Sequence, residues 1–236
     1  PYVGFSAFAH KAGLHASAVK IDPMLYQHID PNLVGNDMRT LVSDMAGRAS
    51  IELKGKEIGI DLTGNKEVLT NVVEKVKDLE SRGYTFEAAD ASFELLLRDE
   101  IGENTSKYFT VESWKVTVEQ AQDGKVSTDA TVKVVANGQR ILQTSEGNGP
   151  VNALDKALRA ALEKIYPEIG NLELIDYKVR ILEGVKGTGA VTRVLIETSD
   201  GNNQWDTVGV HENVIAASWN AISDAVTYGL LKAHVK

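Results

Sequence analysis

The sequence predicts an α+β fold, in which small helical subdomains are followed by two βββα units related by a pseudo-twofold axis. Up to about residue 105, apolar residues recur with helical spacing. After that point, short runs alternate between apolar and polar residues, as expected of half-buried strands. The same order of three strands and a helix appears again about 62 residues further along the chain. Two copies are too few for a solenoid, which needs three or more units.

Helix start and end signals organise the first 105 residues. Asp22-Pro23 and Asp30-Pro31 each place a capping carboxylate before a proline that suits the first helical turn. Asn65 caps a clearer amphipathic pattern, which ends at a basic last turn and a glycine, Arg82-Gly83. The predicted helices cover residues 23–29, 31–34, about 43–56, 65–82 and 86–98.

The rest of the chain carries the two βββα units. The first unit has predicted strands over 114–118, 130–134 and 139–143 and a helix over 150–165; the second has strands over 177–181, 191–198 and 204–208 and a helix over 213–232. Each three-stranded sheet has one apolar face, which its own helix would cover. Aligning the two units places the glycine-marked segment 147–152 on 209–213. We expect three domains, over residues 1–48, 49–88 and 89–236.

Composition narrows the class of protein. Hydrophobic residues make up 43% and charged residues 25% of the 236 residues, which is typical of a chain with a packed core. The net charge is −8 without clustered basic residues, so we expect no nucleic-acid or membrane partner. Without cysteine there is no disulfide, thiolate nucleophile or Cys-ligated zinc. No apolar run approaches the ~20 residues that cross a bilayer, which predicts a cytoplasmic protein.

The chain opens at Pro1, without an initiator methionine and without the features of a signal peptide. We therefore expect a piece of a longer polypeptide. An active site inferred from it would lack some of its parts.

Two histidines lie in a segment of small residues near the start. His10 and His15 are five positions apart, which on a helix separates them by about 140° and rules out the i, i+4 metal pair of a zinc protease. No other Asp, Glu and His grouping has ligand spacing, so we predict no metal site. Two interpretations stay open for each histidine: a structural side chain hydrogen-bonded to backbone, or a general acid or base.

Glycine-marked segments precede the two predicted C-terminal helices. They are Gly147-Asn148-Gly149-Pro150 and Val208-Gly209-Val210. The free N–H groups and positive dipole of a helix start can bind a carboxylate. The alternative is a tight turn that lets the helix pack. The apolar residues just inside both helices are core, pocket wall, or both.

Six segments in order along the chain carry a resemblance to a known family. They cover residues 7–15, 26–31, 34–36, 43–49, 147–150 and 213–219. Together they resemble the linker and C-terminal regions of the 2-isopropylmalate synthase/homocitrate synthase family, nearest its (R)-citramalate synthase branch. The resemblance covers essentially the whole chain.

The resemblance implies an enzyme that condenses acetyl-CoA with a 2-oxo acid in a Claisen-type step, followed by thioester hydrolysis. A divalent metal would act in a catalytic TIM barrel that is absent from this chain, so we expect no cofactor here and no activity from this chain alone. The linker of one protomer would reach the partner's barrel. It would bring His15 for proton transfer and Tyr26 to orient the thioester or a water.

The resemblance also implies a homodimer whose C-terminal domain binds an end-product amino acid. That product is isoleucine in the citramalate branch and leucine in the isopropylmalate branch, and the sequence leaves both open. The expected effector-binding residues are Gly147, Asn148, Gly149, Val151, Leu154, Gly209, Val210, Asn213, Val214 and Ala217. Asp155, Glu212 or backbone carbonyls would accept from the ammonium. A hypothesis of another class is a non-catalytic small-molecule-binding or dimerisation module.

Overall fold

The computed structural model describes residues 2–4, 6–11, 13–27, 29–182 and 187–234. The chain divides into two compact units. The N-terminal unit comprises residues 1–88 and 96–103, and the C-terminal unit comprises 89–95 and 104–236. The α+β class and the two βββα units are confirmed. The predicted division into 1–48, 49–88 and 89–236 stays a prediction.

The N-terminal unit is built from short elements and two longer helices. They are β1 (Ala9–His10), α1 (Gly13–Val19), η1 (Pro23–Leu25), η2 (Pro31–Val34), β2 (Arg39–Thr40), α2 (Arg48–Glu57) and α3 (Lys66–Ser81). β1 pairs with β2 in parallel. α1 packs on α2, and α2 packs on α3.

The predicted capping residues of this unit are confirmed. The Asp22 side chain accepts from the Met24 N–H at 2.9 Å, and the Asp30 side chain accepts from the Asn32 N–H at 3.0 Å. Asn65 accepts from the Val68 N–H at 3.2 Å and begins α3. These side chains satisfy N–H groups that a helix start leaves without an internal partner.

Three predicted helix bounds are wrong. The helix predicted over 23–29 is a 3₁₀ turn that ends at Leu25. The helix placed over about 43–56 begins only at Arg48, because residues 43–46 form a turn in which the Ser43 hydroxyl accepts from the Met45 N–H. The helix predicted from residue 86 begins at Asp90: it is α4 (Asp90–Glu100), whose residues 90–95 belong to the C-terminal unit.

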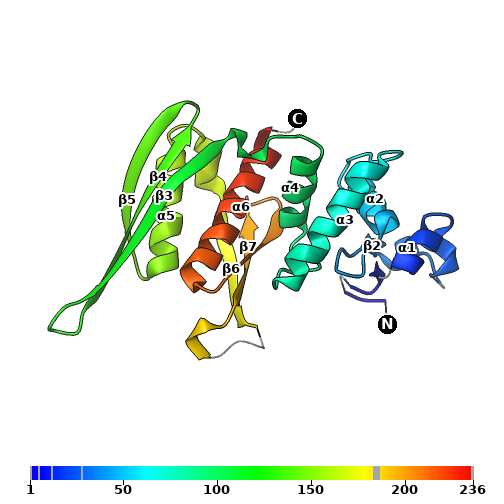
Figure 1. Cartoon of the computed structure of the whole chain (residues 1–236), viewed down its shortest axis with the longest axis horizontal. Helices are drawn as coiled ribbons and strands as arrows, with labels where there is room; N and C mark the ends of the chain where they lie inside the picture. Colours follow the sequence, from blue (N-terminus) through cyan, green and yellow to red (C-terminus); the bar gives the residue numbers. More distant parts are fainter. Residues whose placement is uncertain (1, 5, 12, 28, 183–186, 235–236) are drawn as a thin grey trace. The chain divides into compact units, whose positions relative to one another are not determined.

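The C-terminal unit contains two separate antiparallel sheets and two long helices (Figure 1). The first sheet has the order β3 (Phe109–Gln120), β4 (Val126–Ala136), β5 (Gln139–Gly147); the second has the order β6 (Glu173–Ile181), β7 (Thr192–Ser199), β8 (Gln204–His211). The helices are α5 (Pro150–Leu162) and α6 (Val214–His234), and short 3₁₀ turns lie at Thr105–Lys107, Pro167–Asn171 and Gly187–Gly189. Figure 1 shows the β3–β4 hairpin extending beyond α5.

The core of the C-terminal unit lies between the sheets and the helices. Every second residue of the central strands is buried, as the alternation predicted: Ala130, Val132 and Val134 in β4, and Val194 and Ile196 in β7. On α5, Leu154, Leu158, Ala161 and Leu162 are fully buried, and Val151 is partly buried against the core. Both helices pack on the sheets that precede them, as a layered α+β fold requires.

The structural repeat differs from the one read in the sequence. The first residues of α5 and α6, Pro150 and Val214, are 64 positions apart rather than 62. The counterpart of Gly149 is therefore Asn213, and Gly209 and Val210 lie inside β8 rather than in a turn. Gly209 is required for packing: a Cβ there would lie 2.0 Å from the Ala217 carbonyl oxygen of α6.

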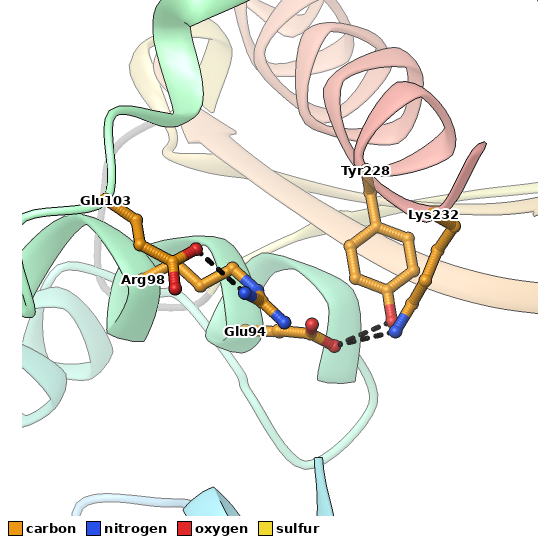
Figure 2. A network of polar contacts seen from close by, with 5 residues as sticks. All are labelled: Glu94, Arg98, Glu103, Tyr228 and Lys232. Carbon is orange, nitrogen blue, oxygen red and sulfur yellow. Dashed lines mark hydrogen bonds and ion pairs between the residues drawn. The ribbon is translucent and has the colours of Figure 1, made fainter. Parts of the chain in front are cut away.

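Ser92 of helix α4 contacts the free edge of β8. The Ser92 hydroxyl accepts from the Val208 N–H at 3.0 Å and donates to Asp224 of α6 at 2.8 Å. The buried Glu94 accepts from the Tyr228 hydroxyl at 2.8 Å and from the Lys232 ammonium at 3.3 Å, and Figure 2 shows these two side chains converging on it. The Val208 N–H at this edge is therefore not available for pairing with another strand.

Three carboxylates lie in one cross-strand row on the second sheet, Asp176, Glu197 and Asp206. Desolvation, helped by the negative charge of Glu197 and opposed by Lys178, raises the pKa of Asp206 to about 6. Because this folded-state pKa is above that of the unfolded chain, the native state gains stability as the pH falls through about 6 and loses it as the pH rises.

We therefore expect Asp206→Asn to stabilise the chain at pH 7.5 by roughly 0.5–1 kcal/mol, a figure that allows for solvent screening. The advantage should shrink towards zero at pH 4, where the wild-type carboxyl is protonated. Urea unfolding at both pH values measures it. An equal effect at pH 4 and pH 7.5 would show that charge repulsion is not the cause.

Candidate functional site

The structure brings together the two predicted catalytic residues of the N-terminal unit. His15 lies on α1, and Tyr26 follows η1, where its backbone N–H donates to the Pro23 carbonyl. Their rings stack, with 4.2 Å between centroids and 29° between planes. Tyr26 is 44% exposed and His15 is partly exposed, so both rings are accessible to another molecule. An imidazole stacked on a phenol and open to solvent can transfer a proton to a bound ligand.

His10 has a different environment. It lies in β1, and its Nε2 is buried without a hydrogen-bond partner among the residues that the structure describes. Desolvation lowers its pKa, and the nearby His15 lowers it further, which keeps the imidazole neutral. The structural interpretation for His10 requires a hydrogen bond to backbone, which Nε2 does not make with any of the described residues, so the role of His10 stays a prediction. His28 lies outside the described residues.

A cavity of about 580 Å³ lies between the start of α5 and the start of β6. Its walls are residues 148–152, Asp155 and Arg159 on the α5 side, and residues 172–174 and Tyr177 on the β6 side. This volume is within the range of pockets that bind small molecules. Three of the predicted effector-binding residues, Asn148, Gly149 and Val151, line it.

Polar groups line the cavity from both sides: Asp155 and Arg159 from α5, and Glu173 from β6. Gly149 is the N-cap and offers no side-chain hydrogen bond, so none of the described residues accepts from the N–H groups of Val151 and Asn152. The Arg159 Nε donates to the Asp155 carboxylate at 2.8 Å, and its guanidinium also donates to the Leu172 carbonyl. The cavity thus joins a free helix start, which favours an anion, to two carboxylates: Asp155, which is paired with Arg159, and Glu173.

The other side of the cavity is largely apolar. Leu172, Leu174 and Tyr177 face the Val151 side of α5, and the Tyr177 hydroxyl shares a hydrogen bond of 2.8 Å with Ser218. An apolar wall beside convergent polar groups is the usual construction of a small-molecule site. The arrangement matches a zwitterion that carries a hydrocarbon side chain.

The remaining predicted effector-binding residues do not line this cavity. Leu154 is fully buried in the core, and Gly147 packs so closely that a Cβ would lie 2.5 Å from the Ala153 nitrogen. The other five belong to β8 and the start of α6: Gly209, Val210, Asn213, Val214 and Ala217.

Arg159 and the cavity residues on the β6 side were not among the effector-binding residues predicted from the sequence. Arg159 could have been found, because an acid and a base at i, i+4 on a helix pair with each other. Leu172, Leu174 and Tyr177 are brought to α5 only by the fold. In the described part of the chain, no group of three or more His, Asp or Glu could hold a metal ion, and no helix is long and apolar enough to cross a membrane.

A duplicated βββα domain with a cavity at one helix start, preceded by a separate and mainly helical unit, has the form of a small-molecule-binding domain. A family described as the LeuA allosteric (dimerisation) domain matches residues 87–230, and one described as homocitrate synthase post-HMGL domain-like matches residues 2–84. The chain belongs to the LeuA allosteric (dimerisation) domain family. The resemblance to this group of synthases is confirmed, and so is the allosteric, dimerising character of the domain.

Curated relatives match along nearly the whole chain. The (R)-citramalate synthase of Streptomyces coelicolor is 69% identical over 100% of this chain, and that of Aquifex aeolicus is 48% identical over 98%. The 2-isopropylmalate synthase of Methanocaldococcus jannaschii is 29% identical over 98%. The chain spans 44% of the length of the first two relatives and 42% of the third.

Proposed function

We propose that the chain is the linker and regulatory region, at the C-terminal end, of a cytoplasmic (R)-citramalate synthase that condenses pyruvate with acetyl-CoA. Identity to relatives of that name reaches 69%, against 29–32% for the relatives named 2-isopropylmalate synthase, which supports this branch. The cavity at the start of α5 is the observation that carries the regulatory part of the proposal.

In this proposal the N-terminal unit completes an active site that lies on another part of the enzyme. His15 transfers a proton, and Tyr26 holds the thioester or a water near the imidazole on which it stacks. The divalent metal implied by the family does not fit the described residues, since no group of three or more potential ligands could hold it. We expect this chain alone to be inactive.

The cavity suits a branched-chain amino acid. Its carboxylate accepts from the N–H groups of Val151 and Asn152 at the positive end of α5. Its ammonium donates to Asp155, which lines the cavity, whereas Glu212 does not. Its side chain packs against Leu174 and Tyr177. We propose isoleucine as the effector. Leucine is the alternative, because the shape of a pocket separates such isomers by only ~1–3 kcal/mol.

We propose a homodimer in which a second copy covers the apolar side of β6. α6 packs on β7 and β8, so it leaves Tyr177, Val179 and Ile181 of β6 exposed on the helix side of the sheet. Ile181 is 68% exposed. A contiguous apolar strip of this kind typically marks a protein–protein interface.

We expect L-isoleucine to raise the melting temperature of the full chain, because a ligand that binds only the native state stabilises it by about 2.7 kcal/mol at a hundred times its Kd. Asp155→Asn should weaken binding at least tenfold, since it removes the acceptor charge while keeping the shape. Differential scanning fluorimetry across a titration measures both. If neither isoleucine nor leucine shifts the melting temperature at millimolar concentration, the sensing role is wrong.

A further inference from the structure

The duplication gives the C-terminal unit two pseudo-equivalent helix starts, and they differ in chemistry. At the first, α5 opens into the cavity described above. Its counterpart lies between α6 and β3. By the 64-residue offset, Asn213 corresponds to Gly149, and the Ile215 and Ala216 N–H groups correspond to those of Val151 and Asn152.

The start of α6 satisfies its own N–H groups. The Asn213 Oδ1 accepts from the Ile215 N–H at 2.9 Å and from the Ala216 N–H at 3.1 Å. The corresponding N–H groups at the start of α5, those of Val151 and Asn152, are free to bind a ligand carboxylate. The same two donors are thus occupied by a side chain in one unit and left to a ligand in the other.

The side-chain space is also filled at the second position. Trp219 is the sixth residue of α6, as Asp155 is of α5. Trp114 follows the β3 irregularity as Tyr177 follows that of β6, so these two correspond. Trp114 and Trp219 pack together with 6.0 Å between centroids, and Trp219 is only 6% exposed. Two indoles stand where the first position has a carboxylate, a phenol and a cavity.

We propose that the start of α6 is a self-occupied counterpart of the effector site. Asn213 takes the place of the ligand carboxylate, and the Trp114–Trp219 pair fills the space of the ligand side chain. Each chain therefore holds one effector molecule, at the start of α5. The inference rests on the proposed amino-acid site and adds its stoichiometry and the means by which the second copy is closed.

The test introduces at position 149 the asparagine that stands at the corresponding position 213. Gly149→Asn should place an amide oxygen over the Val151 and Asn152 N–H groups, and Gly149→Ala is the matched control. Both fit, because the Gly149 backbone is extended and a Cβ there meets nothing within 4 Å. Isothermal titration of L-isoleucine into the full chain should give one site per chain. Affinity should fall at least tenfold in Gly149→Asn and clearly less in Gly149→Ala, because alanine adds a methyl group at the cavity wall but no oxygen that could occupy the two N–H groups.

A second readout needs no ligand. Without isoleucine, Gly149→Asn should melt above Gly149→Ala, because the new side chain caps α5. Two sites per chain, equal loss of affinity in both variants, or no gain in melting temperature would each overturn the inference. If wild type binds neither isoleucine nor leucine, the proposed effector site fails, while the melting comparison still tests whether an Asn can cap α5 as Asn213 caps α6.

Discussion

In a complete enzyme that carries both the catalytic barrel and this chain, His15→Ala is expected to lower kcat by roughly 100- to 10,000-fold, the contribution of a positioned acid or base. The melting temperature should change little, because His15 is only partly buried and its contact is a stack on Tyr26. Tyr26→Phe keeps that stack and removes only the hydroxyl. A loss of kcat without loss of stability in both variants assigns the pair to catalysis.

Subunit mixing decides where His15 acts. If it serves the partner's active site, co-expressing His15→Ala with a variant inactivated in the barrel restores one site in each mixed dimer. Random pairing then gives roughly a quarter of wild-type activity. Activity no higher than that of the separate variants would contradict action across the dimer. Unchanged kcat in His15→Ala alone would instead favour a non-catalytic binding module.

The largest stability effect is expected at Gly209. Gly209→Ala places a Cβ 2.0 Å from the Ala217 carbonyl oxygen and 2.8 Å from the Ala221 nitrogen, both in the backbone of α6. The helix must move away from β8, which we expect to destabilise the fold by about 3 kcal/mol or more. For a chain of this size that corresponds to a fall in melting temperature of about 10 °C.

Gly149→Ala is the control for this substitution, since its Cβ enters open space. Thermal unfolding of the two variants therefore separates two roles of glycine in the same fold. If both glycines tolerate alanine equally, the close approach of α6 to β8 is wrong. If Gly209→Ala folds normally but loses isoleucine binding, the ligand role first predicted for Gly209 is right.

Much of the secondary structure could be predicted, because its signals are local. Period-two alternation located both sets of strands, and a single capping side chain, Asn65, located the start of α3. The strands β1 and β2 could not be predicted, since each has two residues and depends on its partner. The bounds of the helix predicted from residue 86 failed because its apolar residues continue into the turn before Asp90.

The alignment of the two repeats predicted from the sequence was wrong for a different reason. Gly147 and Gly209 look equivalent in sequence, but by the 64-residue offset Gly147 corresponds to His211. Gly149, at the proposed effector site, corresponds instead to Asn213, whose side chain caps the start of α6. A side chain that replaces a ligand cannot be recognised until the fold aligns the two helix starts. The resemblance named His15 and Tyr26 together, and the structure places their rings in contact, while their catalytic role stays a prediction.

The most direct test of the effector site is the amide spectrum of the full chain, selectively labelled with ¹⁵N at valine, asparagine, isoleucine and alanine, during titration with L-isoleucine. We predict saturable shifts of the Val151 and Asn152 amides and none at Ile215 and Ala216. Shifts at the start of α6, or no shift at the start of α5, would contradict the account.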